Sequence, residues 1–393
     1  LEKNEYMGQV KVSVYVKDIR MSGTDDEKYL RSVRLYEKMK PDNPTKQDFL
    51  REAAKIEGVY VPSFYDVDYN ADGTVAEIVP QDGAPAKITK RIVHDMDKSY
   101  FPVKTIVPST EIVQDRVMLE LFRGCIRGCR FCQAGYVYRP VRNRSRDLCA
   151  QYGVESCNDS GYQEMTLASL STSDYPQLTE LCDQLEDFCA QRHVNLSLPS
   201  LRADNFSMEL MQRLAKGRKT GLTFAPEAGT QRLRDVINKG VTEEDLIEKV
   251  RDAFQGGWSS VKLYFMMGLP TETDEDIVGI ARLAEKVAQK YKEVTGKWGV
   301  TVTISVSCFV PKPHTPFQWY GQVSREEFER RQRLLRASIK ERAVKFNYHE
   351  ASVSVLEGAI ARGDRRISQV IYQAWQDGAK VDGWTDHFKH DVW

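Results

Sequence analysis

Three cysteines crowd into eight positions of the chain, and their spacing carries the strongest chemical signal in the sequence. Cys125, Cys129 and Cys132 follow a C-x3-C-x2-C pattern, and glycines at 124 and 128 allow the backbone between them to turn tightly. Thiolates are soft ligands that select zinc or iron–sulfur clusters. A structural zinc site takes four ligands, and no second C-x2-C or closely spaced His pair is evident. Three thiolates suit a four-iron cluster, because they leave one iron open for a substrate or cofactor.

The remaining five cysteines are scattered and are expected to serve other purposes. Cys182 and Cys189 lie on the apolar face of a predicted helix and Cys308 lies in a predicted strand, so we expect these three in the hydrophobic core. Cys149 and Cys157 flank a polar stretch and are expected to be exposed thiols, with a role on an auxiliary cluster as the less favoured alternative. The chain opens on Leu-Glu-Lys-Asn-Glu without the apolar core of a signal peptide. This favours a cytoplasmic protein whose cysteines bind metal rather than form disulfides.

The balance of charge excludes a generally basic nucleic-acid binder. The 393 residues hold 56 Lys and Arg against 56 Asp and Glu, so the formal net charge is zero. A local run of arginines nevertheless follows the cysteines, at Arg139, Arg142, Arg144 and Arg146. We expect a solvated loop with ion pairs here; the alternative is a contact with a phosphate or carboxylate group, for example of RNA. No run of about 18 uncharged apolar residues occurs, so we expect no membrane span.

Strand-like runs alternate with amphipathic helices from about residue 116 onward. The runs cover residues 117–122, 164–171, 194–198, 221–225, 260–267 and 300–310, with one further strand candidate at 349–356. Strands that alternate with helices at this spacing indicate parallel βαβ units. Six such units predict an α/β fold with a partial or complete barrel, in which chemistry gathers at the carboxyl ends of the strands. The cysteine loop directly follows the first of these runs.

Residues 1–114 are expected to form a smaller α+β region. Residues 8–19 alternate as a half-buried strand does, two helical patterns cover 25–39 and 47–56, and a hairpin joins 64–69 to 75–79. Residues 80–114 carry several Pro and charged residues, which is typical of an extended connection. We therefore expect three parts: an N-terminal region at 1–114, a barrel at 115–360 and a C-terminal extension at 361–393.

The cysteine loop, with the aromatic Phe131 before its third cysteine, resembles the cluster-binding motif of the radical S-adenosylmethionine (SAM) superfamily. This resemblance implies that Cys125, Cys129 and Cys132 hold a [4Fe-4S] cluster whose fourth iron chelates SAM. It further implies that the reduced cluster, supplied by an electron donor such as flavodoxin or ferredoxin, releases a 5′-deoxyadenosyl radical. The fold that it implies is a parallel (β/α)6 partial TIM barrel with the cluster loop after the first strand.

Three further segments resemble one branch of this superfamily, the methylthiotransferase-like and cobalamin-associated enzymes. They are residues 223–230 with 237–240, residues 264–273 and residues 311–316. The chain is most similar to a bacterial group that carries a cobalamin-binding-like domain ahead of the barrel. No Asp-x-His-x-x-Gly cobalamin loop occurs in this chain, so we expect cobalamin only if a segment ahead of Leu1 supplies it.

The resemblance also indicates which residues line the SAM pocket. The superfamily's second strand commonly ends in Gly-Gly-Glu, whose Glu contacts the SAM amino group. Here the counterpart is Ser169-Leu-Ser171, which has no carboxylate, although hydroxyls and exposed carbonyls can accept from an ammonium group. The residues expected to line the pocket are Phe131, Ser169, Ser171, Arg202, Glu227 and Gly268.

Each of the last three residues has an alternative interpretation. Glu227 could be the N-cap of the helix that starts near Thr230, and Arg202, like Asp204, could belong to a loop that leads into a helix. Gly268 is expected to be a position where the backbone approaches a ligand closely, rather than a plain turn.

The function that we expect is a radical SAM enzyme that modifies an unidentified substrate, with methyl or methylthio transfer among its reactions. The alternative is a non-catalytic zinc or iron–sulfur module that serves nucleic-acid or partner binding.

Overall fold

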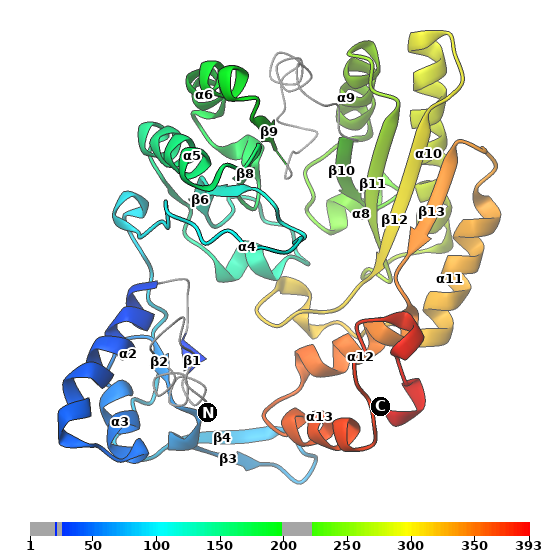
Figure 1. Ribbon diagram of the computed structural model, residues 1–393. Coiled ribbons are helices and arrows are strands. Elements are labelled where there is room, and N and C mark those ends of the chain that lie inside the picture. The colour runs from blue at the N-terminus through cyan, green and yellow to red at the C-terminus, as the bar shows by residue number, and fades with distance from the viewer. Residues whose placement is uncertain (1–19, 22–25, 199–221) are drawn as a thin grey trace. The chain divides into compact units, whose positions relative to one another are not determined.

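A computed structural model describes residues 20–21, 26–198 and 222–393 of the chain. The chain divides into two compact units, residues 1–101 and residues 102–393 (Figure 1). No helix among the described residues is long and apolar enough to cross a membrane. The predicted strand at residues 8–19 and the pocket residue Arg202 lie outside the described residues.

The first unit is a small α+β structure with its own core. Helices α2 (Asp26–Met39) and α3 (Lys46–Ala53) pack through an edge-to-face contact between Tyr36 and Phe49. A capping box formed by Thr45 and Asp48 begins α3, as the sequence predicts. The remaining elements are the antiparallel pair β1 (Arg20–Met21) and β2 (Val59–Tyr60), the antiparallel hairpin β3 (Tyr65–Tyr69) and β4 (Val75–Pro80), and the short helices η1 (Lys40–Asp42), η2 (Pro62–Phe64) and η3 (Met96–Lys98). Both predicted helices and the hairpin are confirmed.

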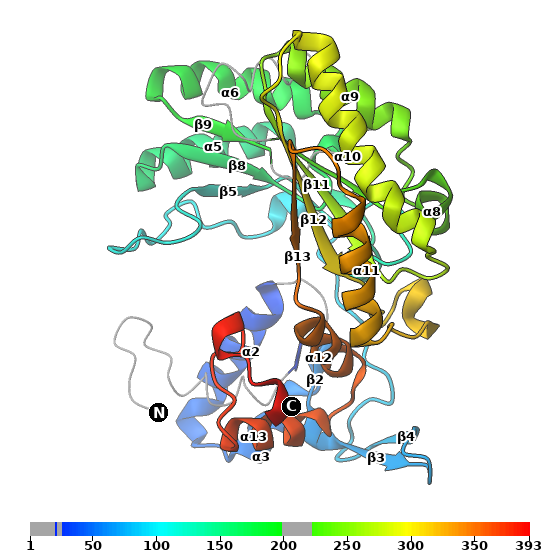
Figure 2. The same cartoon turned by 90° about the vertical axis from the view of Figure 1, so that its right-hand side faces the viewer.

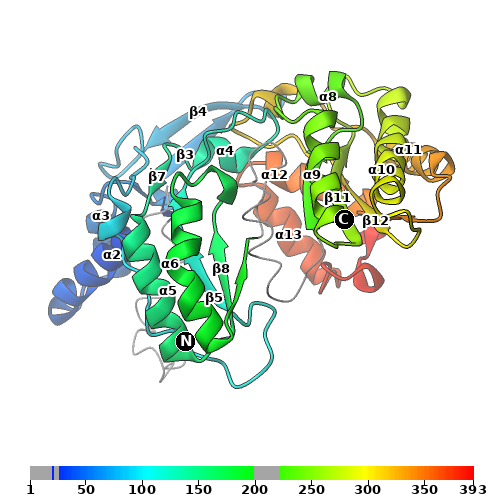
Figure 3. The same cartoon turned by 90° about the horizontal axis from the view of Figure 1, so that it is seen from above.

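The second unit begins with a three-stranded parallel sheet. Its strands are β5 (Val117–Glu120), β8 (Glu164–Ala168) and β9 (Asn195–Ser197), in that order. Helix α5 (Arg146–Ser160) connects β5 to β8, and helix α6 (Leu178–Arg192) connects β8 to β9; the two helices lie side by side against the sheet (Figure 3). Shorter elements lie in the connections: β6 (Phe122–Arg123), α4 (Gln133–Val137), β7 (Arg142–Asn143) and η4 (Thr172–Asp174).

A four-stranded parallel sheet follows in the same unit. It contains β10 (Leu222–Glu227), β11 (Ser260–Met267), β12 (Thr301–Cys308) and β13 (Val344–Tyr348) in chain order. Helices α8 (Gln231–Val236) and α9 (Glu243–Gln255) follow β10, α10 (Asp274–Thr295) follows β11, and η5 (Pro316–Trp319) and α11 (Arg325–Ser338) follow β12. The chain ends with α12 (Ala351–Arg362), α13 (Ile367–Gln376), η6 (Thr385–His387) and η7 (His390–Val392).

This repeat of parallel strands and helices confirms the predicted α/β class. The partial barrel stays a prediction, because the described strands form two separate parallel sheets. The predicted strand at 349–356 is wrong. Those residues begin α12, and the strand is β13, which ends one residue earlier. Ala351, Ser354 and Gly358 are the buried residues of α12, and their spacing places them on one helical face rather than on alternate sides of a strand.

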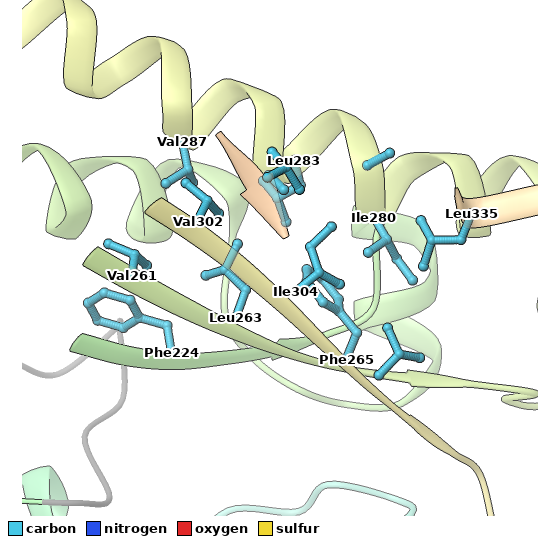
Figure 4. Packing of buried hydrophobic residues seen from close by; sticks show 14 of the residues in the cluster. Phe224, Val261, Leu263, Phe265, Ile280, Leu283, Val287, Val302, Ile304 and Leu335 are labelled. Carbon is cyan, nitrogen blue, oxygen red and sulfur yellow. The ribbon is translucent and has the colours of Figure 1, made fainter. Parts of the chain in front are cut away.

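The core of the second sheet lies between its strands and the three helices α9, α10 and α11, which Figure 2 shows over one face. In Figure 4, Leu263 and Phe265 of β11 and Ile304 of β12 point toward Ile280 of α10. Burying each such side chain contributes about 1.5–3 kcal/mol. The alternate residues of β12 face the other way and are only half-buried. The sheet therefore has one apolar helix-covered face and one face that is open and more polar.

Candidate functional site

The cysteine loop begins where β5 ends, at the carboxyl end of the first parallel strand. Strands β6 and β7 pair antiparallel at its base, with Phe122 opposite Asn143. Gly124 has a positive φ of 89°, and a Cβ there would lie 2.7 Å from the carbonyl oxygen of Tyr138 and 2.8 Å from that of Pro140. Because backbone atoms cause this crowding, only glycine fits. The two sides of the loop are thereby held close together at its base.

The three cysteines of the loop have different surroundings. Cys129 is buried, whereas Cys125 and Cys132 are half-buried. The backbone N–H of Arg127 donates to Cys125 Sγ at 3.4 Å, and the N–H of Gly135 donates to Cys132 Sγ at 3.4 Å. Cys132 is also the N-cap of α4. These two N–H groups help to fix the positions of the Cys125 and Cys132 sulfurs in the loop.

This donor set fits an iron–sulfur cluster. Among residues 20–21, 26–198 and 222–393, no three His, Cys, Asp or Glu side chains converge as the ligands of one metal ion do. In a four-iron cluster each thiolate binds a different iron, so its ligands do not need to meet at a single point. Three cysteines on one short loop, two of them with N–H donors, are compatible with that arrangement.

One side of the loop is docked on the end of α8. The N–H of Arg130 donates to the carbonyl of Ile237 at 2.9 Å, and its guanidinium donates to the carbonyl of Val236 at 2.6 Å. Asn238 Nδ2 returns a hydrogen bond of 2.8 Å to the carbonyl of Gly128. Phe131, which the resemblance predicts in the SAM pocket, packs here against a buried cluster that includes Ile237. These contacts join the loop to the part of the second unit that contains the four-stranded sheet.

The other side of the loop is joined to the end of β8 by an ion pair. Arg127 Nε and one terminal nitrogen donate to the two carboxylate oxygens of Asp174, at 2.9 and 2.5 Å. Ser171 Oγ donates to Asp174 Oδ2 at 2.7 Å, and Ser169 Oγ lies 3.0 Å from Thr172 Oγ1. The structure therefore places both predicted serines at this strand end.

Asp174 is a residue that the sequence reasoning missed. The expectation was a strand end without a carboxylate, yet the Asp174 side chain is only 4% exposed there. Its position three residues after Ser171 is the one local signal that could have found it.

Glu227 ends β10 and forms an ion pair with Lys239. The distance from Lys239 Nζ to Glu227 Oε1 is 3.0 Å, and the two side chains are 9% and 16% exposed. Glu227 has a positive φ of 68°, and the register of β10 with β11 shifts between Phe224 and Glu227. The alternative reading of Glu227 as an N-cap is wrong, since Thr230 caps α8 by accepting from the N–H of Leu233. A residue other than glycine adopts a positive φ only where its surroundings impose it.

Gly268 follows β11 and packs against the aromatic ring of Phe328 rather than lining an open pocket. Its φ is 87°, and a Cβ there would lie 2.5 Å from Phe328 Cε1. Its N–H donates to Glu272 Oε2 at 2.6 Å. The Glu272 side chain is 1% exposed, and it also forms an ion pair in which Arg331 Nη1 lies 2.5 Å from Glu272 Oε2. Burial raises the pKa of Glu272 to about 7, although the Gly268 N–H and Arg331 oppose that rise. Packing against Phe328 thus accounts for the glycine.

The arginine run is largely internal, so the expectation of a solvated loop is wrong for two of its members. The Arg142 guanidinium donates to the carbonyls of Tyr138 and Pro140, and that of Arg144 donates to the carbonyl of Glu120. Arg142 is 7% exposed and Arg144 1%. Buried carbonyls need such donors because no water reaches them. An RNA contact through Arg142 and Arg144 is therefore also wrong.

The two remaining arginines of the run lie nearer the surface. Arg139 is exposed and donates to the carbonyl of Arg127 in the cysteine loop, and Arg146 pairs with Asp147 at 2.8 Å.

The expectation of exposed thiols at Cys149 and Cys157 is wrong as well. Both are buried in α5. The sequence of this helix is largely polar, but the helix packs on α6. Burial raises the pKa of Cys157 to about 11, which keeps the thiol protonated and unreactive at neutral pH. Cys182 and Cys308 are buried as predicted, and Cys189 is half-buried.

Comparison with known proteins connects this geometry to a family. The family model described as the radical SAM superfamily matches residues 119–284, which begin in β5 and end in α10. The chain contains a domain of the radical SAM superfamily. It is an enzyme of that superfamily, and membership implies a [4Fe-4S] cluster and SAM as cofactors.

Two relatives show how the radical SAM chain compares in sequence. It is 29% identical over 362 residues to an uncharacterized protein of Methanocaldococcus jannaschii, covering 87% of this chain and 77% of that protein. It is 21% identical over 315 residues to the tRNA-2-methylthio-N(6)-dimethylallyladenosine synthase of Neorickettsia sennetsu, covering 77% of this chain and 62% of the synthase.

Among solved structures, the radical SAM methyltransferase TsrM from Kitasatospora setae matches with a TM-score of 0.48 and 14% identity. The match covers 76% of this chain and 54% of that one. The chain thus spans between about half and three quarters of the length of these proteins.

Proposed function

We propose that Cys125, Cys129 and Cys132 bind a [4Fe-4S] cluster whose fourth iron takes SAM, and that the enzyme uses it to modify a substrate still to be identified. The observation that carries this proposal is the fixed position of the cysteine loop. It lies at the carboxyl end of β5 and is held by Asp174 on one side and by α8 on the other. The carboxyl ends of barrel strands are where this fold places its chemistry.

Several elements contribute residues to the proposed site, each with a different role. When bound, the cluster and SAM would supply the radical chemistry, and the chain supplies binding, orientation and exclusion of water. The N–H groups of Arg127 and Gly135 hold the Cys125 and Cys132 sulfurs in position. At the end of β8, Ser169 offers a hydroxyl that can accept from the amino group of SAM, in place of a carboxylate.

Glu227 would face SAM or the substrate from the end of β10. The ion pair with Lys239 holds the Glu227 side chain in place, and the positive φ of Glu227 sets the direction in which that side chain leaves the backbone. Phe131 supports the loop from behind through its packing against the α8 cluster. Arg202 and Gly268 are assigned to the proposed pocket by the family resemblance alone, since Gly268 packs against Phe328 in the structure.

Methyl or methylthio transfer is the reaction class that the relatives favour. Two relatives are named methylthiotransferases, one of them as putative, and one is named an uncharacterized methyltransferase. Others are named tRNA-2-methylthio-N(6)-dimethylallyladenosine synthases. A reductant such as flavodoxin or ferredoxin would deliver the electron. We assign no cobalamin site to these residues, because the chain has no Asp-x-His-x-x-Gly loop. Membership of an enzyme superfamily also favours this proposal over a non-catalytic zinc or iron–sulfur module.

Metal and sulfide analysis of anaerobically reconstituted protein tests the ligand assignment. The parent should bind iron and sulfide in equal amounts, and alanine at Cys125, Cys129 or Cys132 should remove most of both. Cys308→Ala is the matched control, because Cys308 is buried in β12 and should leave the cluster in place. One zinc without sulfide in the parent, or a full cluster in Cys125→Ala, would contradict the proposal.

A further inference from the structure

The ion pair between Arg127 and Asp174 ties the cysteine loop to a different strand of the barrel. Arg127 lies midway between Cys125 and Cys129, and its guanidinium meets both carboxylate oxygens of Asp174 at 2.9 and 2.5 Å. The Asp174 side chain is 4% exposed and that of Arg127 28%. A two-pronged guanidinium–carboxylate contact fixes orientation as well as distance. The position of residue 127 is therefore set from the end of β8.

Asp174 is also held in place by hydrogen bonds that do not involve Arg127. It ends the short helix η4, and its N–H donates to the carbonyl of Ser171 at 2.8 Å. Ser171 Oγ donates to Asp174 Oδ2 at 2.7 Å. Thr172 Oγ1 donates to the carbonyl of Leu167 within β8, which anchors the turn to the strand. Since the carboxylate accepts hydrogen bonds from Arg127 and Ser171, its influence on the cysteine loop passes through these two residues.

The backbone of Arg127 connects this ion pair to the sulfur of a proposed cluster ligand. The N–H of Arg127 donates to Cys125 Sγ at 3.4 Å, so the residue whose side chain is fixed by Asp174 also donates to a proposed ligand. Hydrogen bonds to the sulfurs and nearby charge are among the factors that set the reduction potential of an iron–sulfur cluster. Residues that orient metal ligands from outside commonly change metal affinity by 10–100-fold when they are replaced.

We propose that Asp174 is a positioning residue for the iron–sulfur cluster: through Arg127 it holds the Arg127 N–H against Cys125 Sγ, and it thereby controls how firmly the cluster is retained and at what potential it is reduced. This inference rests on the proposed function, because it concerns the cluster assigned to the three cysteines.

Asp174→Asn tests the inference, because it keeps the shape of the side chain and removes its charge. Glu164→Gln is the matched control. Glu164 pairs with Arg116 and also lies on β8, but at the start of the strand, away from the loop. Both variants and the parent would be reconstituted anaerobically. The measurements are the rate at which a chelator removes iron, the reduction potential and the electron paramagnetic resonance spectrum of the reduced cluster.

We expect Asp174→Asn to lose its cluster about tenfold faster than the parent, with a shifted potential and an altered spectrum. Glu164→Gln should match the parent in all three. Arg127→Lys keeps the positive charge but loses the two-pronged contact, and it should change the cluster in the same direction as Asp174→Asn. If Asp174→Asn fails to fold by circular dichroism, Arg127→Lys decides the question.

Two negative results have different meanings. A folded Asp174→Asn or Arg127→Lys variant with the release rate, potential and spectrum of the parent would overturn this inference and leave the proposed function standing. A parent protein that assembles no iron–sulfur cluster would overturn the proposed function, and the inference with it.

Discussion

Charged residues at the strand ends form ion pairs in the site, and Glu227 with Lys239 is one example. Both side chains are largely buried, so removing one partner leaves an uncompensated charge. Lys239→Gln should lower the free energy of unfolding by about 3 kcal/mol, as measured by denaturant titration. The double variant Glu227→Gln/Lys239→Gln should recover most of that loss. Equal losses in the single and double variants would show that the two charges do not depend on each other.

Glu272 gives the protein a specific dependence of stability on pH. Burial raises the pKa of its carboxyl from 4.5 to about 7 in the folded state. Between these values the folded chain holds a proton that the unfolded chain has released, so this group's contribution to stability falls as pH rises from about 4.5 to 7. Relative to Glu272→Gln, the parent should lose up to about 3 kcal/mol of unfolding free energy between pH 5 and pH 7.5. A constant difference between the two proteins across that range would contradict the assignment.

The cysteines could be predicted from the sequence, but several of their partners could not. The spacing of Cys125, Cys129 and Cys132 is local, so it is readable directly. Asp174 meets Arg127 across 47 positions of sequence, and no local pattern shows that contact. Arg142 and Arg144 resemble a solvated charge run because their partners are backbone carbonyls, which any sequence could supply.

At the scale of elements, the close approach of the β10–α8 connection to α10 depends on a glycine. A Cβ on Gly229 would lie 2.3 Å from the carbonyl oxygen of Asp276 and 2.3 Å from the nitrogen of Ile280, both in the backbone of α10. Backbone atoms in a helix cannot move away singly, so Gly229→Ala should lower the free energy of unfolding by about 3 kcal/mol.

A matched glycine provides the control for that substitution. Nothing lies within 4 Å of a Cβ added at Gly321, and Gly321→Ala should leave the unfolding free energy within about 0.5 kcal/mol of the parent. Similar unfolding midpoints for Gly229→Ala and Gly321→Ala would show that the β10–α8 connection can move away from α10 at little cost.

The elements themselves were predicted best where the pattern repeats or where a cap marks the start. The buried strands β11 and β12 are apolar at alternate positions, and the capping box of Thr242 and Asp245 begins α9 as the sequence indicates. The strand β13 was misplaced because residues 344–348 contain Lys345 and Asn347, whereas the helix that follows is more apolar. A pattern of only five residues does not distinguish these cases.

For the whole molecule, the division into two units makes the connection between them the expected point of cleavage. Residues 102–115 contain no helix or strand, and Lys104 is exposed. Limited trypsin digestion should therefore cut first at Lys104, and the product that begins at residue 105 should keep its circular dichroism spectrum. First cuts within α10 or the strands of the second unit would contradict this division.

The superfamily could be recognised from the sequence, since the cysteine motif and the repeated βα rhythm agree. The substrate could not, because the residues that choose a substrate are not distinguished from packing residues by a single sequence. Phe131 and Gly268 illustrate this limit. Each is explained in the structure by packing, Phe131 against the α8 cluster and Gly268 against Phe328.

The most direct test of the central claim is the electron paramagnetic resonance spectrum of the reduced, reconstituted protein before and after SAM is added. If Cys125, Cys129 and Cys132 leave one iron of a [4Fe-4S] cluster open, SAM should change the spectrum of the parent, and 5′-deoxyadenosine is the product to seek in the same sample. A four-iron spectrum that SAM leaves unchanged, or the absence of any iron–sulfur signal, would contradict the account.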